Sequence, residues 1–249
     1  MVHTVPVTVN GYAYDARYSD ATYQDVLLPL LQNLEALHAA REGRTIAFLA
    51  GPPAAGKSTV ALLLELLARD VEGCDLQCVC LDGFHHHNDY LRSHTIVRDG
   101  KTISLASLKG APETFDAQAF AAKLAELRAG GACGWPVYDR TIHDPSPDAV
   151  CVTAPIVLVE GNYLLLDEDP WLGLAPMADY TVFLRADEAL LRERAVTRKA
   201  KGGISREEAL AHYERSDEPN IRRVLTCSRP ADFTMRLAPD GELLPVTAA

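Results

Sequence analysis

One short run constrains the fold of this chain more than any other feature. It reads Gly51-Pro52-Pro53-Ala54-Ala55-Gly56-Lys57-Ser58-Thr59. The apolar residues 45–50 precede this run, and the largely apolar residues 60–67 follow it. A strand, a glycine-bounded loop ending in Gly-Lys-Ser and a helix together make the context of a Walker A phosphate loop. An ordinary strand-to-helix turn is the competing interpretation, but the sequence favours a site for a nucleoside triphosphate.

The residue types in this loop match what binding of a polyphosphate requires. Gly51 and Gly56 permit backbone conformations in which successive N–H groups turn inward around an anion. The helix that begins near Lys57 adds the positive end of its dipole. Lys57 can reach the β- and γ-phosphates, and the Ser58 hydroxyl can bind Mg²⁺. We therefore assign all nine residues, through Thr59, to the nucleotide.

Length and charge limit the remaining classes of function. The 249 residues suit one α/β domain with small additions, and the net charge of −10 argues against nucleic acid or a membrane as partner. No run of about 18 apolar residues occurs, and residues 1–6 lack the layout of a secretory signal. The cysteines form no Cys-x-x-Cys pair, which is typical of reduced thiols in a cytoplasmic protein. The oligomeric state stays open, with a homodimer as one option.

The pattern of apolar residues predicts an α/β fold. Asn10-Gly11 between alternating residues predicts a hairpin, and residues 25–40 have the spacing of an amphipathic helix. We expect strands at 45–50, 77–82, 155–160, 180–184 and 231–237, and helices at 57–68, 116–128, 187–200 and 205–215. This alternation indicates a doubly wound parallel sheet with helices on both faces. Residues 1–43 are expected to form a hairpin-helix extension, and residues 44–249 one domain.

Two acids are expected at the carboxyl ends of strands, where open α/β sheets bind their ligands. Asp82 follows one predicted strand, and Glu160 ends another. Phosphoryl transfer to an alcohol needs a group that accepts the hydroxyl proton and a metal ion that spreads charge. Asp82 and Glu160 are the carboxylates best placed for these tasks. A helix cap or an exposed strand-end acid is the alternative for each.

Two polar segments could bind a small molecule. The histidine run 85–87 could hydrogen-bond a substrate, bind zinc or face solvent, and the first is favoured because no further metal ligand stands at a usable spacing. Residues 135–145 are bounded by prolines and are expected to form a rigid loop. In it, Tyr138, Arg140 and His143 offer donors suited to hydroxyl or carboxylate groups. An ion-paired surface loop is the alternative.

Residues 192–203 are predicted to form a lid. They contain five basic residues and one acid, and they end in Gly202-Gly203. Arg194 and Arg198 are four residues apart and share one helical face. Cationic side chains that close over a γ-phosphate stabilise its transfer and exclude water. A solvated basic helix face is the alternative.

Together these blocks resemble the uridine kinase, phosphoribulokinase and bacterial pantothenate kinase superfamily, and within it the YggC-type kinases. The resemblance rests on an ordered series of blocks: the phosphate loop, Asp82-Gly83-Phe84-His85, residues 109–116, Pro136-x-Tyr138-Asp139-Arg140-x-x-His143, Glu160-Gly161-Asn162-Tyr163 and the Arg-x-x-x-Arg lid. It implies a P-loop kinase core of five parallel strands, ATP with Mg²⁺ as donor, and Asp82 as the catalytic base.

The resemblance also assigns residues to the acceptor. Tyr138 and His143 match the block through which uridine kinases hold the nucleoside, and His85 and Asn162 lie in two of the other shared blocks. Arg140 stands where uridine kinases have an aromatic residue, which argues against uridine. Asn220 falls in a block shared with the YggC-type group and is a candidate contact for nucleotide or substrate.

These observations predict an ATP-dependent kinase that phosphorylates an alcohol of a sugar, a nucleoside or a pantothenate-like metabolite. Nucleoside monophosphate kinases have similar loops, but their acceptor is already an anion and needs no base such as Asp82. The alternative from another class is a regulator that binds ATP without an acceptor. Such a regulator would have no use for the set of Asp82, Tyr138 and His143.

Overall fold

A six-stranded sheet forms the centre of the computed structural model, which describes residues 1–9, 11–98 and 100–246. Its strand order is β12-β11-β10-β3-β9-β4. The parallel members are β3 (Thr45–Ala50), β4 (Leu76–Cys80), β9 (Ile156–Gly161), β10 (Tyr180–Ala186) and β11 (Phe233–Leu237). The doubly wound α/β fold is thereby confirmed.

The prediction of five strands needs one correction. β12 (Leu243–Pro245) adds a sixth strand, which runs antiparallel to β11. A tight turn makes this return possible: the Ala238 N–H donates to the Glu242 carbonyl at 2.8 Å, and Gly241 has a left-handed φ of 93°. An antiparallel neighbour needs only such a short turn, whereas a parallel one needs a long crossover.

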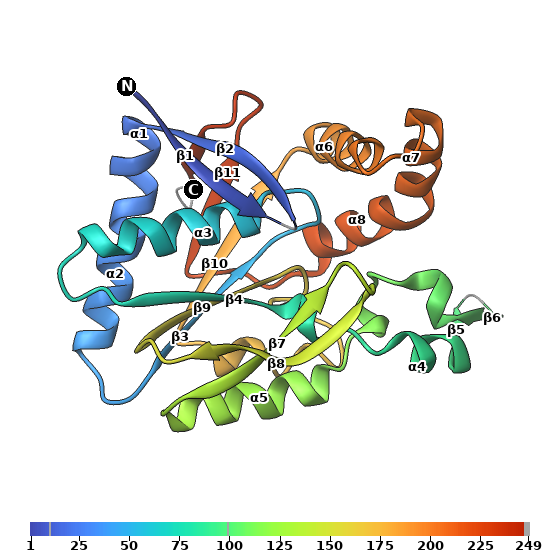
Figure 1. Ribbon diagram of the computed structural model, residues 1–249, viewed down its shortest axis with the longest axis horizontal. Coiled ribbons are helices and arrows are strands. Elements are labelled where there is room, and N and C mark those ends of the chain that lie inside the picture. The colour runs from blue at the N-terminus through green and yellow to red at the C-terminus, as the bar shows by residue number, and fades with distance from the viewer. Residues whose placement is uncertain (10, 99, 247–249) are drawn as a thin grey trace.

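Helices cover both faces of this sheet (Figure 1). On β3, Ile46 and Phe48 pack toward one face, and Ala47 and Leu49 toward the other, as the two-residue period of a strand requires. One face is covered by α5 (Ala117–Ala129), and the other by α2 (Leu28–Ala39), α3 (Lys57–Leu67) and α6 (Glu188–Lys201). Burial on both faces explains why β3 reads as a continuous apolar run.

The amino-terminal segment packs against this core. β1 (Val2–Val9) and β2 (Tyr12–Ser19) form the predicted hairpin, although Asn10 of its Asn-Gly turn lies outside the described residues. A short α1 (Asp20–Thr22) and a π-helical turn (Tyr23–Leu27) lead into α2, which confirms the predicted helix. Leucines of α2 are buried in the cluster that also holds β3 and β10. The division of the chain at residue 43 stays a prediction.

The expectation of a rigid loop at residues 135–145 is wrong. β7 (Cys133–Asp139) and β8 (Asp144–Val152) form an antiparallel hairpin there. Pro136 is tolerated because it lies at a register shift between Trp135 and Val137, where the ladder does not require its missing N–H. The indole of Trp135 is buried against Phe84 and Phe120 and anchors the hairpin to the core.

Two further regions complete the chain. Between β4 and α5 lie α4 (Asn88–Ser93) and the hairpin of β5 (Thr95–Arg98) and β6 (Lys101–Ser104). After α6 follow α7 (Arg206–His212), a π-helical turn (Tyr213–Asp217) and α8 (Glu218–Cys227). The sequence predicts a helix near 205–215 but misses α8. Pro219 looks like a helix breaker, yet it directly follows the π-helical turn Tyr213–Asp217, where the hydrogen-bond register of the continuous helical run changes.

Candidate active site

The loop between β3 and α3 has the backbone of an anion site. A Cβ atom at Gly51 would lie 2.2 Å from the Leu184 carbonyl oxygen of β10, so only glycine fits there. Gly56 has a left-handed φ of 101° and is the residue before α3. No side chain caps the first turn of α3, so its N–H groups are available to a ligand. The local geometry therefore matches the predicted phosphate loop.

Lys57 lies across this loop. Its Nζ donates to the Asn162 Oδ1 at 2.6 Å and to the Pro52 carbonyl at 3.1 Å. Burial lowers the pKa of Lys57, and the charge of Glu160 opposes this shift. Because both hydrogen-bond acceptors are neutral oxygens, a bound phosphate would offer the ammonium a better partner than either one.

Ser58 and the buried Glu160 form a second pair. The Ser58 Oγ donates to the Glu160 Oε1 at 2.6 Å, and Glu160 lies near the carboxyl end of β9. Burial raises the pKa of Glu160; Lys57 opposes this shift, and the charge of Asp82 adds to it. A hydroxyl beside a carboxylate is a donor set that suits Mg²⁺, which takes its other ligands from phosphate and water. The residues present therefore fit this ion.

Asp82 stands beside the pair of Ser58 and Glu160. It lies in the helical turn Leu81–Phe84, directly after β4. Its side chain is 33% exposed, and the Arg140 Nη2 lies 3.5 Å from its Oδ2. A carboxylate that is open to solvent at the end of a strand can reach a ligand, whereas Glu160 is enclosed.

Aromatic and cationic side chains gather next to Asp82. The ring of His85 lies 5.0 Å from that of Tyr138 and 3.8 Å from that of Phe115. Burial lowers the pKa of His85, while Asp82 opposes this shift. The Lys109 Nζ lies 5.3 Å from the centre of the Tyr138 ring, and the Arg140 guanidinium 5.8 Å from it. The structure thus brings three of the predicted acceptor residues together and adds Lys109, which the sequence marks only as part of a family block.

Two predicted acceptor residues take other places. The Asn162 Oδ1 accepts a hydrogen bond from Lys57, so Asn162 lies beside the phosphate loop and away from the acceptor cluster. His143 has a left-handed φ of 54°, and its carbonyl accepts from the Lys109 Nζ at 2.7 Å and the Asn88 Nδ2 at 2.9 Å. Its backbone therefore orients Lys109, while its ring is exposed.

The histidine run does not form a metal centre with its neighbours. Within the described ranges, no group of three or more His, Cys, Asp or Glu side chains is arranged to hold a metal ion. Instead, the His85 Nδ1 lies 2.8 Å from the Asp82 carbonyl oxygen, and the ring of His86 stacks on Tyr90. The ring of His87 lies 3.2 Å from an Asp144 oxygen.

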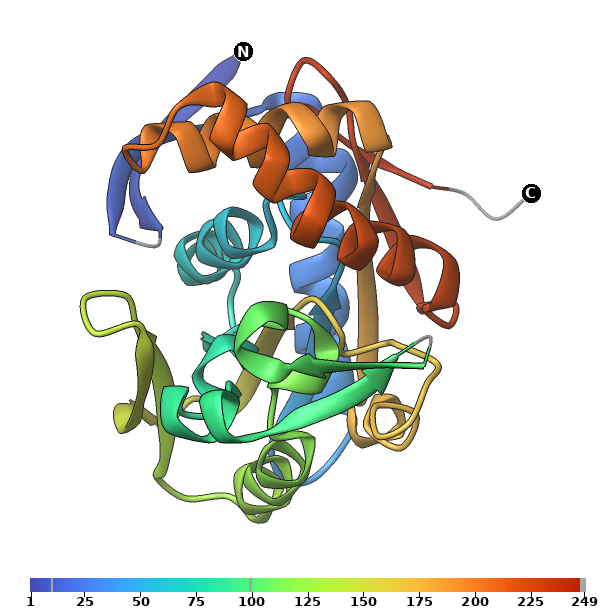
Figure 2. The ribbon, with the colours of Figure 1, turned by 90° about the vertical axis from the view of Figure 1, so that its right-hand side faces the viewer.

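The predicted lid lies over the phosphate loop. The Arg194 Nε donates to the Ala54 carbonyl at 2.8 Å, and Arg198 adds to the lowering of the Lys57 pKa that burial causes. Figure 2 shows α6, α7 and α8 together on the side of the molecule next to α3. Both arginines are thus near the loop that the sequence assigned to ATP.

An ion-pair network joins α8 to the segment before α5, and the sequence gives no signal for it. Arg223 lies 2.8 Å from Glu113 and 2.6 Å from Glu168, and Arg98 lies 2.7 Å from Glu113. Burial alone would raise the pKa of Glu113, but Arg223, Arg98 and a backbone hydrogen bond together outweigh this effect and hold the pKa below its usual value. The network fixes α8 against residues that flank the cluster around Tyr138.

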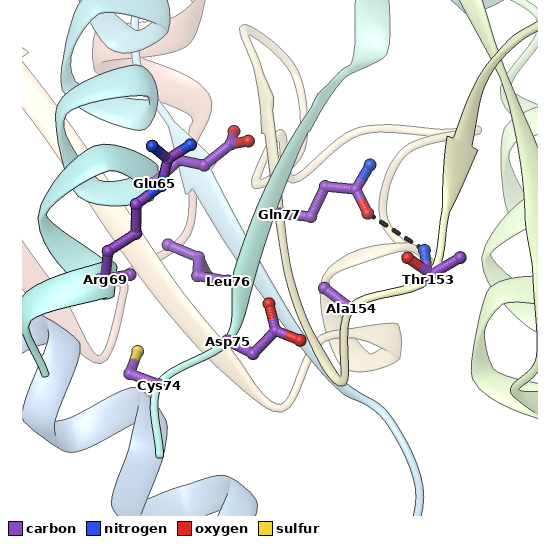
Figure 3. Close-up of a pocket in the computed structure, with 9 residues that line it drawn as sticks. Glu65, Arg69, Cys74, Asp75, Leu76, Gln77, Thr153 and Ala154 are labelled. Atoms are coloured by element: carbon purple, nitrogen blue, oxygen red, sulfur yellow. Dashed lines mark hydrogen bonds between the residues drawn. The ribbon is translucent and has the colours of Figure 1, made fainter. Parts of the chain in front are cut away.

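A separate hollow lies at the other end of β4 (Figure 3). Its volume is about 320 Å³, and none of the predicted site residues lines it. The lining residues are Glu65, Ala68, Arg69, Cys74, Asp75, Leu76, Gln77, Thr153 and Ala154. In the part of the chain that the structure describes, no helix has the length and apolar character needed to cross a membrane.

Fold and site together define a P-loop kinase: a glycine-bounded loop, a Lys-Ser-Glu set beside it and carboxylates at the ends of parallel strands. The chain belongs to the Phosphoribulokinase / Uridine kinase family, whose model matches residues 46–243. It is 43% identical over 239 residues to YggC of Escherichia coli (strain K12), covering 95% of this chain and 97% of that protein. Pantothenate kinase of Lactococcus lactis subsp. cremoris (strain MG1363) is 27% identical over 194 residues, 76% of this chain and 58% of that enzyme.

A solved structure supports the same assignment of the chain to a family of kinases. The crystal structure named "putative fructose transport system kinase" from Silicibacter sp. TM1040 has a TM-score of 0.76 and 31% identity, covering 84% of this chain and 98% of that one. The resemblance inferred from the sequence is therefore confirmed. Membership makes this protein an ATP-dependent small-molecule kinase, a phosphotransferase that acts on an alcohol group.

Proposed function

We propose that the protein transfers the γ-phosphoryl group of ATP to a hydroxyl of a sugar, a nucleoside or a pantothenate-like metabolite. One observation carries this proposal: the partly exposed carboxylate of Asp82 stands beside Ser58 and the buried Lys57 and Glu160. Transfer to an alcohol requires a proton acceptor, a phosphate site and a metal site within reach of one another. The carboxyl ends of β3, β4 and β9 supply these three.

In this proposal each residue of the phosphate side has one task. The Lys57 Nζ donates to the β- and γ-phosphates, and Asn162 orients it in the absence of nucleotide. Ser58 and Glu160 would hold Mg²⁺, which neutralises phosphate charge when bound. Arg194 and Arg198 close over the transferring group and exclude water.

The acceptor side works through Asp82 and its neighbours. A carboxylate oxygen of Asp82 takes the proton of the attacking hydroxyl, and Arg140 orients this carboxylate. His85 and Tyr138 supply hydrogen bonds and ring surface for the acceptor. The His143 carbonyl holds Lys109 over the Tyr138 ring, so His143 positions a cation at this surface.

Substitution of Asp82 by Asn tests the proposal. We expect acceptor-dependent ADP release to fall about 100-fold or more, because positioned proton acceptors contribute about that factor, while ATP affinity is retained. The matched control is Asp89→Asn on α4, since Asp89 is an exposed acid that pairs only with Arg92 among the described residues. The parent enzyme is first screened with sugars, polyols, nucleosides and vitamins.

Two results would contradict this scheme. Unchanged turnover in Asp82→Asn would remove Asp82 from the mechanism. ATP binding without ADP release for any acceptor in the panel would instead indicate the ATP-binding regulator.

A further inference from the structure

One face of the amino-terminal hairpin runs along α3 and past its beginning. Alternation along β2 places Tyr12, Tyr14 and Ala16 on the same side of the strand. Ala16 is 3% exposed and packs in a cluster with Leu63 of α3. Figure 1 shows that β2 begins near the amino end of α3, where the phosphate loop ends, and the two tyrosines lie in this first part of β2.

Tyr14 reaches the phosphate loop directly. Its hydroxyl forms a hydrogen bond with the Thr59 Oγ1, and Thr59 follows the Mg²⁺-binding candidate Ser58 in the first turn of α3. Tyr12 approaches the lid, because its Oη lies 3.7 Å from the position that a Cβ at Gly202 would take, just beyond α6. The hairpin therefore spans the space between the loop and the lid.

The phosphate loop has two distinguishable ends. On one side, Lys57 contacts Asn162 and lies near Glu160 and Asp82, which marks the end where the γ-phosphate is transferred. The Thr59 side chain instead faces Tyr14 of the hairpin. Because a nucleotide is extended and its terminal phosphate lies at Asp82, its nucleoside must leave the loop away from Asp82.

Arg194 of α6 contacts the phosphate loop just before α3 begins. A Cβ at Gly56 would lie 3.1 Å from the Arg194 Nη2, and the Arg194 Nε is bonded to the Ala54 carbonyl. The Tyr14 side chain is an exposed aromatic, with 41% of its surface open, although it is tied to Thr59 by its hydroxyl. An accessible ring held in place by its polar end can stack on a base or a sugar at little entropic cost.

We propose that the amino-terminal hairpin forms the outer wall of the ATP site at its nucleoside end, with the Tyr14 ring as the contact. This inference rests on the proposed function, since it takes its direction from the transfer end at Asp82. It makes β1 and β2 part of the nucleotide site, and it gives Tyr14 a share in recognition of the nucleoside but not of the phosphates.

The test compares two ligands that share the phosphates and differ in the nucleoside: ATP and inorganic tripolyphosphate. Dissociation constants are measured with Mg²⁺ for the parent protein, Tyr14→Ala and Tyr14→Phe. Tyr14→Ala should weaken ATP binding about 5- to 150-fold, the range for loss of one aromatic stacking partner, and change tripolyphosphate binding less than about 2-fold. Tyr14→Phe keeps the ring and should retain most of the ATP affinity.

Tyr90→Ala is the matched control. Tyr90 is 40% exposed, like Tyr14, and lies on α4 stacked with His86 and His94. In steady-state assays Tyr14→Ala should raise the KM for ATP and leave kcat nearly unchanged, and Tyr90→Ala should change neither. The melting temperature of each variant shows that it is folded.

Each other outcome overturns the inference. Equal weakening of ATP and tripolyphosphate would mean that Tyr14 acts only through Thr59 and the loop. An unchanged ATP affinity in Tyr14→Ala would place the nucleoside elsewhere. In both cases the parent still binds ATP, so the proposed function stands; a parent protein that binds neither ligand would instead overturn the proposed function and this inference together.

Discussion

Substitution of Lys57 by Met gives a quantitative test of the phosphate loop. In the free protein the Lys57 Nζ donates to two neutral oxygens, at 2.6 and 3.1 Å. With a triphosphate bound, it would donate to anionic oxygens, and a hydrogen bond to a charged group contributes about 1.5–3 kcal/mol. Two such bonds at the lower value give about 3 kcal/mol. The dissociation constant for ATP should therefore rise roughly 150-fold.

The ATP-induced change in melting temperature measures this loss. At an ATP concentration of about 100 times the parent dissociation constant, binding stabilises the parent by about 2.7 kcal/mol; in Lys57→Met, with roughly 150-fold weaker binding, this falls to about 0.3 kcal/mol. For a chain of this size, about 1 kcal/mol corresponds to a shift of roughly 2–4 °C. The shift should therefore fall from about 5–11 °C to about 1 °C.

Lys123→Met is the control for removal of a lysine. Lys123 lies on α5 and pairs with Glu126 and Asp148, away from the phosphate loop. Its ATP-induced shift should equal that of the parent. Each shift is taken relative to the same variant without ATP, so any change in the stability of the free protein cancels. If Lys57→Met kept the full shift, the phosphates would bind elsewhere and the reasoning from the loop would be refuted.

Two further predictions concern stability. Asp179→Asn should lower the free energy of unfolding at pH 7 by about 3 kcal/mol in urea titrations, because the Asp179 carboxylate pairs with Arg128 and accepts from the Ile46 N–H. Burial alone would raise the pKa of Asp179, but Arg128, the Ile46 N–H and Arg41 together outweigh it and lower the pKa. This contribution is therefore present above the ordinary value of 3.8 and is lost as the pH falls through the lowered pKa. An equal loss at pH 7 and pH 2 would contradict the prediction. Deletion of residues 2–19 should leave a folded protein by circular dichroism, whereas deletion of residues 2–43 should not, since α2 buries several leucines worth roughly 1.5–3 kcal/mol each. A soluble, ATP-binding 44–249 fragment would instead support the boundary at residue 43.

The parts of the fold that sequence reasoning predicted are those with strong local signals. The phosphate loop is one continuous run, and its glycines are required by local backbone geometry. β3 and β9 are buried on both faces, so each reads as an unbroken apolar segment. Because parallel strands end at the same edge of the sheet, Asp82 and Glu160 could be placed near the loop without a structure.

Other parts depend on contacts that no local pattern records. Proline suggested a loop at residues 135–145, but burial of Trp135 against the core outweighs that preference. The bond between Tyr14 and Thr59 joins residues 45 positions apart, and Arg223 and Glu113 are 110 apart. Such pairs form only when the whole chain has folded. Their residue types are ordinary, so the sequence alone does not single them out.

The two sides of the site are built from different parts of the chain, and this has a consequence for the acceptor. The central sheet supplies the ends that hold the phosphate loop, Asp82 and Glu160. Apart from His85, which follows the turn after β4, the cluster around Tyr138 instead comes from the β7–β8 hairpin and from the segment before α5, which lie outside that sheet. Substitutions in these segments can change which acceptor binds without disturbing the strands that position the phosphate loop, Asp82 and Glu160. The identity of the acceptor should therefore depend on Arg140, Lys109 and their neighbours in these two segments, while binding of ATP depends on the sheet.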